Sequence, residues 1–263
     1  MIESSVKDGI ATVTITTKTM PPSFFPACRR VFEELAEDAG LRCVVIHSSE
    51  ECFSYGLDLP ATFTELGPLF AGGGATTRGI LLSTIHAWQA SFTAIAHCPV
   101  PVIAAVHGWC VGGGLDLVSA CDIRLASADA QFSLREAKVA IVADLGSLQR
   151  LPAIIGPGHT RELAYSGKDI DAQRAQEIGL VNTVHPTPEA TRSAAYALAA
   201  EIAANSPLAV RGIKQVLEFG EGKPIATALE YVATWNAAFL ASEDLAEAAA
   251  AFMEKRAPVY TGR

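Results

Sequence analysis

Residues 101–117, PVIAAVHGWCVGGGLDL, constrain the fold more than any other part of the sequence. An apolar run that is typical of a buried strand leads into three glycines, and an apolar run that opens a helix follows. Glycine lets the backbone approach a neighbour or a ligand closely, because it has no side chain. A strand, a glycine turn and a helix in this order are typical of the βα units that build parallel sheets.

Strand-like and helix-like segments alternate through the first half of the chain. The expected elements are strands at residues 9–17, 41–49 and 101–108, with helices from about residue 24 and over 78–97. Residues 50–77 are expected to form a loop whose glycine-rich end, AGGGATT at 71–77, is mobile. Two short strands in DIRLAS and AQFSL complete a pattern that predicts an α/β fold with parallel pairing.

The second half of the chain is expected to be mostly helical. Short helical pieces follow residue 145, and longer helices are expected near residues 187–205, 207–219, 223–241 and 242–256. The α/β core is therefore expected to give way to a helical C-terminal region near residues 190–205.

Composition excludes several classes of partner. Half of the 263 residues are hydrophobic, which supports a sizeable core, and the formal net charge is −8. An acidic chain lacks the basic face that nucleic acids and anionic membranes require, so neither is an expected partner. No apolar run reaches the ~18 residues that a membrane-spanning helix needs.

The six cysteines predict a reducing compartment and no metal site. They form no CxxC pair and no pattern with histidines that is typical of zinc ligands. Several lie in apolar runs, which favours buried free thiols. The first residues contain no basic segment followed by an apolar one, so no signal peptide is indicated. We therefore expect a cytoplasmic protein.

Two glycine-containing turns are candidates for binding negative charge. The turn at residues 112–114 opens a helix, whose first N–H groups point outward at the positive end of the helix dipole. The stretch CFSYGLDL, residues 52–59, also follows a predicted strand and can turn at Gly56. Loops after neighbouring parallel strands meet at one edge of the sheet. One N–H from each loop can then hold one oxygen, as an oxyanion hole does. Tight packing of helix on strand is the structural alternative.

Three acids in apolar surroundings are the candidate catalytic groups: Asp116, Glu136 and Asp144. The structural alternatives are stabilisation of a helix N-terminus by Asp116, an exposed Glu136, and Asp144 as the N-cap of a helix over 145–151. If the three converge beside the oxyanion hole, they form a site that moves protons without a metal or a nucleophile. Carboxyls crowded in apolar surroundings have raised pKa values, which suit acid and base catalysis near neutral pH.

These residues carry a resemblance to a known family. The block from PVIAAVHG to LPAIIG, residues 101–156, resembles the crotonase, or enoyl-CoA hydratase/isomerase, superfamily. The likeness extends through CFSYGLDL, AQEIGLVNTVHP and the terminal AFMEKRAPVYTGR. It implies a crotonase-like ββα spiral core with a helical C-terminal region. It also implies a core with the acyl-CoA site at 1–195, and a region at 196–263 for trimerisation and closure of the CoA pocket.

The resemblance assigns a ligand and its contacts. In that superfamily two backbone N–H groups hold the thioester oxygen of an acyl-CoA, and the matching positions are Tyr55 and Gly113. Gly56, Leu57 and Asp58 follow Tyr55 and complete the expected substrate-binding segment. Coenzyme A is then part of the substrate, and no separate cofactor is implied. A homotrimer or a dimer of trimers is the implied assembly.

The acids separate the branches of the superfamily. The hydratases carry glutamate at the positions of Asp116 and Glu136, and glycine at the position of Asp144. The Δ3,5-Δ2,4-dienoyl-CoA isomerases carry Asp, Glu and Asp there, as this chain does. The resemblance therefore implies an isomerase that moves a proton from C2 to C6, with Glu136 and Asp144 as base and acid in either order. The alternatives are an enoyl-CoA hydratase and a non-catalytic CoA-binding relative.

Overall fold

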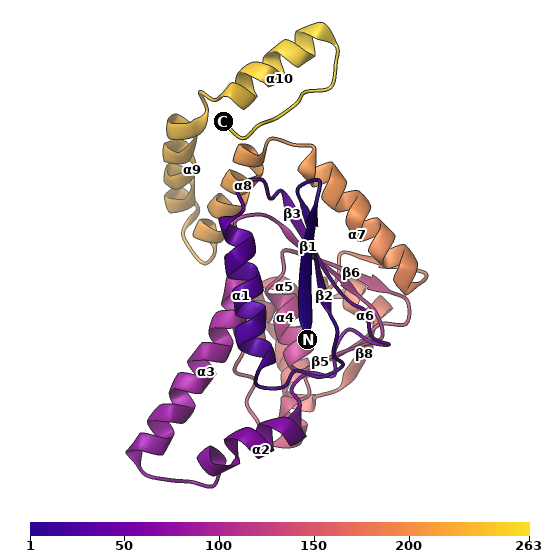
Figure 1. Ribbon diagram of the computed structural model, residues 1–263, viewed down its shortest axis with the longest axis vertical. Coiled ribbons are helices and arrows are strands. Elements are labelled where there is room, and N and C mark those ends of the chain that lie inside the picture. The colour runs from indigo at the N-terminus through magenta and orange to yellow at the C-terminus, as the bar shows by residue number, and fades with distance from the viewer.

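A six-stranded sheet forms the centre of the computed structural model, which describes residues 1–263 (Figure 1). Its order is β1-β2-β3-β4-β6-β9, with β1 antiparallel to β2 and all other pairs parallel. The strands are β1 (Ile2–Lys7), β2 (Ile10–Ile15), β3 (Cys43–Ser48), β4 (Val102–Val106), β6 (Ile123–Ser127) and β9 (Thr183–His185). The register sets Val45 of β3 beside Ile103 of β4. The parallel pairing that the sequence predicts is confirmed.

A second, smaller sheet lies beside the first. It contains β5 (Trp109–Val111), β7 (Gln131–Ser133) and β8 (Asp169–Asp171), with β5 parallel to β7 and β7 antiparallel to β8. A single bridge pairs Ser54 with Cys110 and adds the 52–59 segment to this layer. Because β5 follows β4 after only two residues, the chain passes directly from the large sheet to the small one and then into the glycine turn.

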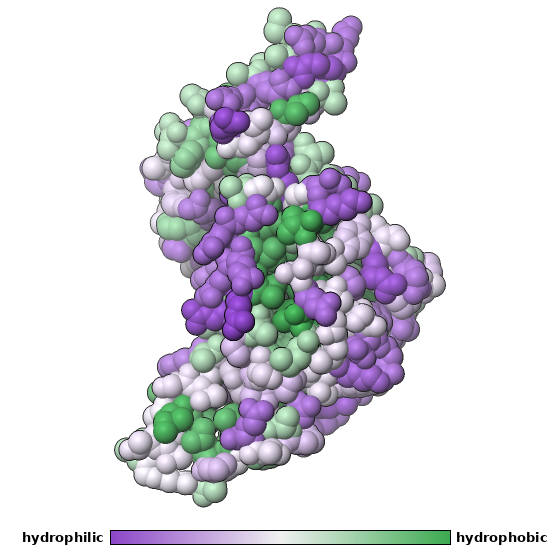
Figure 2. All heavy atoms as spheres, in the orientation of Figure 1, coloured by the Kyte–Doolittle hydropathy of each residue, from purple (hydrophilic) through white to green (hydrophobic).

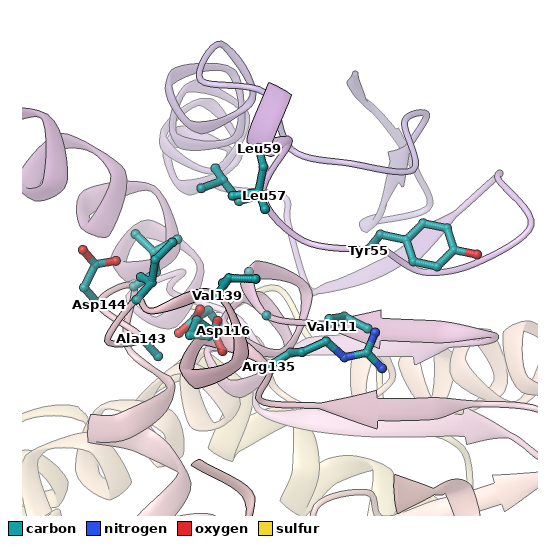
Figure 3. A pocket seen from close by; sticks show the side chains of 14 residues that line it. Tyr55, Leu57, Leu59, Val111, Asp116, Arg135, Val139, Ala143 and Asp144 are labelled. Carbon is teal, nitrogen blue, oxygen red and sulfur yellow. The ribbon is translucent and has the colours of Figure 1, made fainter. Parts of the chain in front are cut away.

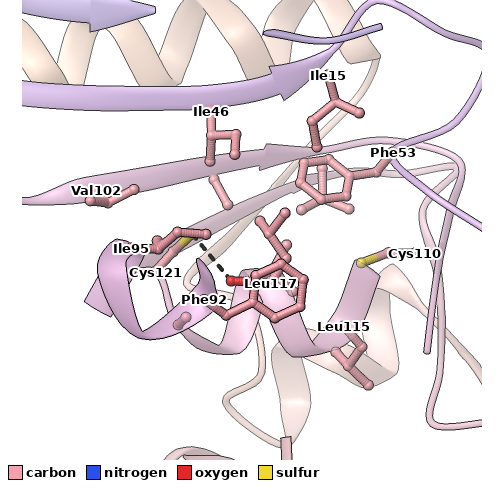
Figure 4. Close-up of a cluster of buried hydrophobic side chains, with 14 of the residues drawn as sticks. Ile15, Ile46, Phe53, Phe92, Ile95, Val102, Cys110, Leu115, Leu117 and Cys121 are labelled. Carbon is pink, nitrogen blue, oxygen red and sulfur yellow. Dashed lines mark hydrogen bonds between the residues drawn. The ribbon is translucent and has the colours of Figure 1, made fainter. Parts of the chain in front are cut away.

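Helices cover the sheets and enclose the core. They are α1 (Phe24–Glu37), α3 (Ala75–Ala96), α4 (Gly113–Ser119), α5 (Ser147–Ser166), α6 (Ala172–Glu177) and α7 (Pro188–Ala203). Helix α1 shows the cause of this packing, because its buried residues recur at helical spacing and form one apolar face. Helix α4 is buried along its whole length. Figure 4 shows Phe92 and Ile95 of α3 packed against Leu117 of α4 and the strands.

Helices α8 (Pro207–Gly220), α9 (Ile225–Phe239) and α10 (Glu243–Glu254) form the C-terminal region. Figure 1 shows α9 and α10 as an arm that extends away from the sheets. The predicted boundary between residues 195 and 196 falls inside α7, whose Ala195 and Ala199 pack on the sheet. The helices that stand apart from the sheets therefore begin with α8.

The loop expected over residues 50–77 is wrong in its central part. Residues 59–70 form α2 (Leu59–Phe70), and α3 already begins at Ala75. Helix α2 starts because the side chain of Asp58 accepts a hydrogen bond from the Ala61 N–H at 2.9 Å and Pro60 occupies the first turn. The first strand, β1, was also absent from the expected elements, since most of its residues are exposed and give no apolar alternation.

No helix of the structure combines the length and the apolar character that crossing a bilayer requires.

Candidate functional site

The glycine turn before α4 brings an unpaired backbone amide to the surface of a pocket. Gly112 has φ +52°, a conformation that favours glycine, and its carbonyl accepts the Asp116 N–H at 2.9 Å to begin the helix. A Cβ on Gly114 would lie 3.0 Å from the Cβ of Ser54, so only glycine lets α4 approach the 52–59 segment this closely. The N–H of Gly113, in the first turn of α4, has no acceptor within the protein.

The 52–59 segment supplies a second unpaired amide next to the first. Gly56 has φ +83°, and a Cβ there would lie 3.1 Å from the nitrogen of Gly113, so the two loops are in close contact. Met20 pairs with this segment: its N–H donates to the Gly56 carbonyl at 2.8 Å and its carbonyl accepts the Asp58 N–H at 3.0 Å. Successive N–H groups of an extended chain point to opposite sides, so the N–H of Leu57 faces away from Met20 and has no acceptor within the protein.

The assignment of the oxyanion contact to Tyr55 requires a correction. The N–H of Tyr55 donates to the carbonyl of Lys18 at 2.7 Å, so this amide is already occupied. Figure 3 shows the Tyr55 side chain at one end of the pocket, directed away from the acids. The unpaired amides of the two adjoining loops are those of Leu57 and Gly113. The sequence gives no signal for this choice, because it depends on the pairing of Met20 with the segment.

A pocket of about 280 Å³ opens beside these two amides (Figure 3). Its apolar lining includes Leu57, Leu59, Val139, Ile141, Ala143 and Leu145. The three predicted acids, Asp116, Glu136 and Asp144, all line it, together with Gly113. Gly56 and Asp58 are not part of the lining: Gly56 forms the turn, and Asp58 caps α2 and accepts a hydrogen bond from Thr19 at 2.9 Å. The structure thus brings the three acids and the glycine turn together, a convergence that was only a condition at the level of the sequence.

Asp116 is the most deeply placed of the acids. Its side chain is buried, and its Oδ1 accepts the N–H of Ser147, the first residue of α5, at 2.6 Å. The carboxylate therefore stabilises the start of α5, a helix to which it does not belong. Burial raises the pKa of Asp116 to about 6, although the hydrogen bonds from Ser147 oppose this increase.

Glu136 faces the glycine turn. It begins the short 3-10 helix η1 (Glu136–Val139), and a Cβ on Gly112 would lie 3.1 Å from its Oε1. Its other carboxyl oxygen, Oε2, is buried and has no hydrogen-bond partner. Burial, followed by the neighbouring charge of Asp116, raises the pKa of Glu136 to about 7. An unpaired carboxyl with a pKa near neutrality has the properties of a general base.

In Figure 3, Asp144 lies on one side of Asp116, and Arg135 and Tyr55 lie on the opposite side. It is half-buried between Ala143 and Leu145, and burial raises the pKa of its carboxyl. The N-cap of α5 is Gly146, with no side-chain cap, so the alternative role of Asp144 as a helix cap is wrong. Its backbone carbonyl accepts a hydrogen bond from Nε2 of Gln89 on α3 at 2.7 Å. The sequence interpretation did not include Gln89.

Arranged in this way, the site can hold one oxygen and move protons at two places. The unpaired N–H groups of Leu57 and Gly113 can together bind an oxygen that acquires negative charge. Glu136 lies next to that position, and Asp144 lies farther along the apolar pocket. Burial raises the pKa values of both carboxyls, that of Glu136 to about 7.

Curated proteins that are similar in sequence include several isomerases. The chain is 42% identical over 246 residues to the mitochondrial Δ3,5-Δ2,4-dienoyl-CoA isomerase of Dictyostelium discoideum, covering 92% of this chain and 83% of that protein. It is 39% identical over 239 residues to the peroxisomal protein of the same name from Arabidopsis thaliana, covering 90% and 86%. A probable enoyl-CoA hydratase of Bacillus subtilis is 33% identical over 240 residues.

Solved structures of enoyl-CoA hydratases share the fold. That of Bacillus anthracis superimposes with a TM-score of 0.88 at 30% identity, over 100% of this chain and 99% of that one. The structure of a putative enoyl-CoA hydratase from Streptomyces coelicolor gives a TM-score of 0.90 at 30% identity. The crotonase-like core with a helical C-terminal region is therefore confirmed. The sequence profile of the Enoyl-CoA hydratase/isomerase family matches residues 5–263. The chain belongs to the enoyl-CoA hydratase/isomerase, or crotonase, family of enzymes.

Proposed function

We propose that this enzyme converts 3,5-dienoyl-CoA to 2,4-dienoyl-CoA. The thioester oxygen of the substrate binds the N–H groups of Leu57 and Gly113, and the acyl chain lies in the apolar pocket. Hydrogen bonds to that oxygen stabilise the negative charge that develops on it when a proton leaves C2. The C2 protons thereby become acidic enough for a carboxylate to remove.

Glu136 is the base in this proposal, because it lies beside the glycine turn that holds the thioester oxygen. Its carboxylate takes one proton from C2, and the electron pair of that C–H bond enters the conjugated dienolate. The double bonds shift from C3–C4 and C5–C6 to C2–C3 and C4–C5 as C6 receives a proton. Glu136 then holds a proton that it returns to solvent before the next turnover.

Asp144 is the acid that supplies the proton at C6. C2 and C6 are four bonds apart, so one short side chain cannot serve both carbons. Asp144 lines the pocket on the side away from Tyr55, and burial raises the pKa of its carboxyl. An acyl chain that fills the pocket removes more water from this carboxyl, which favours its protonated form further. After donation the carboxylate takes a proton from solvent.

Asp116 has a positioning role. Its carboxylate is buried and is held by the Ser147 N–H, so it does not move the transferred proton. Burial is the main cause of the raised pKa of Glu136, and the charge of Asp116 adds to it. A hydratase holds its water between the acids at positions 116 and 136. Here the carboxylate of Asp116 is instead bound by the Ser147 N–H, which favours the isomerase over the hydratase. The presence of Asp144 in the pocket is the observation that carries the proposal.

Replacement of Asp144 tests the proposal directly. We expect Asp144→Asn to lower the rate of diene conjugation, followed by absorbance with 3,5-dienoyl-CoA esters, by about 10²–10⁴-fold, the usual contribution of a general acid. Asp171→Asn is a matched control, because Asp171 is an exposed N-cap of α6 and asparagine caps equally well. Unchanged turnover in Asp144→Asn would rule out its role.

Two further assays distinguish the alternatives. A hydratase consumes 2-enoyl-CoA and yields the 3-hydroxyacyl product, which chromatography detects. A non-catalytic relative binds CoA esters, as calorimetry would show, without changing either substrate.

The substrate, the assembly and the cellular location of the enzyme complete the proposed function. Coenzyme A is part of the substrate, and the assembly is a homotrimer or a dimer of trimers in which residues 196–263 mediate trimer contacts and close the CoA pocket. The names of the similar isomerases place those proteins in mitochondria or peroxisomes. The cytoplasmic location of this chain stays a prediction.

A further inference from the structure

The loop that carries Asp144 has few hydrogen bonds of its own. Between η1 and α5, none of the N–H groups of residues 142–145 donates to another backbone group. Leu145 is fixed through its carbonyl, which accepts Nη1 of Arg150 at 3.3 Å. At Asp144 itself the bond from Nε2 of Gln89 to the backbone carbonyl, at 2.7 Å, is the one contact of this kind. Ala143 and Leu145 hold the loop by apolar burial, and the Gln89 side chain supplies the hydrogen bond that holds the backbone at Asp144 itself.

Gln89 lies on a well-anchored part of α3. The preceding residue, Trp88, stacks on Phe25 of α1 with ring centroids 4.4 Å apart and an angle of 15° between the planes. Phe92, one turn farther along, is fully buried in the core. The N-terminal half of α3, by contrast, exposes Ile80 and Leu82. Gln89 thus connects the rigid half of α3 to the loop of the acid.

We propose that Gln89 is a positioning residue for the isomerisation, and that its amide holds the backbone of Asp144 so that the carboxyl reaches C6. This inference rests on the proposed function. Gln89 does not line the pocket and does not touch the substrate, so its effect passes through Asp144 alone. Removal of the C2 proton by Glu136 does not need this contact.

A positioning role for Gln89 and a general structural role predict different effects on the two half-reactions, which are removal of the C2 proton and protonation at C6. Without the Gln89 amide the dienolate still forms, but protonation at C6 slows and the proton returns to C2 more often. In D₂O, the Glu136 carboxyl exchanges its proton with solvent while the dienolate persists, so reprotonation at C2 leaves deuterium in substrate that is recovered before completion. The ratio of C2 exchange to isomerisation should rise, whereas partial unfolding or weaker substrate binding lowers both rates together.

The experiment compares the full-length protein with Gln89→Met, which keeps the length of the side chain and removes its donor. We expect kcat for isomerisation to fall on the order of 10–100-fold, since a displacement near 1 Å in an active site costs up to about 10²-fold. KM should change little, and the exchange ratio, measured by mass spectrometry, should rise. Gln89→Glu, which has no donor when ionised, should give the same pattern at pH 8 and serves if the first variant folds poorly.

Gln149→Leu is the matched control, because Gln149 is exposed on α5 and its side chain makes no hydrogen bond. It should behave as the wild type in both assays. Unchanged isomerisation in both Gln89 variants, or an equal fall of exchange and isomerisation, would overturn the positioning role while leaving the proposed function intact. Wild-type protein that isomerises no dienoyl-CoA ester would overturn the proposed function and this inference with it.

Discussion

The carboxyl of Glu136 combines burial, a charged neighbour and an unpaired oxygen in one side chain. Burial and the charge of Asp116 raise the pKa of Glu136 to about 7, from the 4.5 of an ordinary glutamate. The folded protein therefore binds more protons than the unfolded chain between these two values, and its stability falls as the pH rises through that range. A catalytic base is thus obtained at the expense of folding free energy.

Glu136→Gln should separate the catalytic role of this carboxyl from its effect on folding stability. The variant loses isomerase activity, yet its free energy of unfolding relative to the wild type should increase by about 2 kcal/mol between pH 5 and pH 8, because only the wild type has a carboxyl to ionise at position 136. Urea unfolding at the two pH values measures this difference. A difference between variant and wild type that is the same at both pH values would contradict the raised pKa.

The sequence was sufficient to name the acids of the site and insufficient for its amides. Asp116 and Glu136 could be named as candidates because they lie in apolar surroundings, but their spacing in the sequence did not establish that they meet in one pocket. The choice between the amides of Tyr55 and Leu57 was not predictable. It is decided by the hydrogen bonds that Lys18 and Met20 make from another part of the chain, and no local pattern encodes such a pairing.

At the scale of elements, the position of α4 depends on Arg124 of β6. This buried guanidinium has no carboxylate partner and instead donates to three carbonyls. Nε bonds to Leu180 at 2.7 Å, while Nη1 bonds to Cys121 at 2.6 Å and to Val118 at 3.4 Å. Arg124 thereby ties the C-terminal end of α4 to the chain before β9. The other end of α4 carries the Gly113 amide and Asp116.

Arg124→Leu should therefore be strongly destabilising. The substitution leaves buried carbonyls without donors, at about 1–3 kcal/mol for each unsatisfied group, so we expect a loss of about 3 kcal/mol or more in the free energy of unfolding. Arg161→Leu is the control, because Arg161 is exposed on α5 and makes no hydrogen bond. Chemical denaturation of both variants measures the loss. Equal stability of the two would show that the carbonyls find other partners.

Elements were predictable where an apolar period is long and unbroken. The C-terminal helices and the strands β4, β6 and β7 meet this condition, and their predicted ranges agree with the structure to within a few residues, whereas β5 was not predicted. Helix α2 does not, because Gly67 and Pro68 interrupt its pattern and only Thr62 is buried. Its N-terminal signal, an aspartate followed by a proline at residues 58 and 60, was present in the sequence and was outweighed by the glycines that follow.

The whole molecule consists of a dense body and a C-terminal arm. Lys214 of α8, the helix before the arm, donates to Asp122 at 2.8 Å, and Arg42 of the body donates to the carbonyl of Tyr260, which follows α10, at 3.0 Å. Beyond these contacts α9 has no buried residue, and Phe252 and Met253 of α10 are 86% and 82% exposed. Figure 2 shows the arm projecting beyond the body, and apolar residues also gather at the opposite end, over α2 and α3. Large apolar side chains left in water on an isolated chain are typical of a surface that another subunit covers.

The predicted trimer makes this surface testable. Light scattering coupled to size exclusion should give the mass of three or six chains of 27.6 kDa for the wild type. Replacing Phe252 and Met253 together by aspartate should lower that mass without loss of helical circular dichroism, because a buried unpaired charge opposes association. Tyr165→Asp, at a 78% exposed aromatic residue on α5, should leave the mass unchanged. A monomeric wild type, or a double variant that keeps the wild-type mass, would mean that the arm is exposed for another reason.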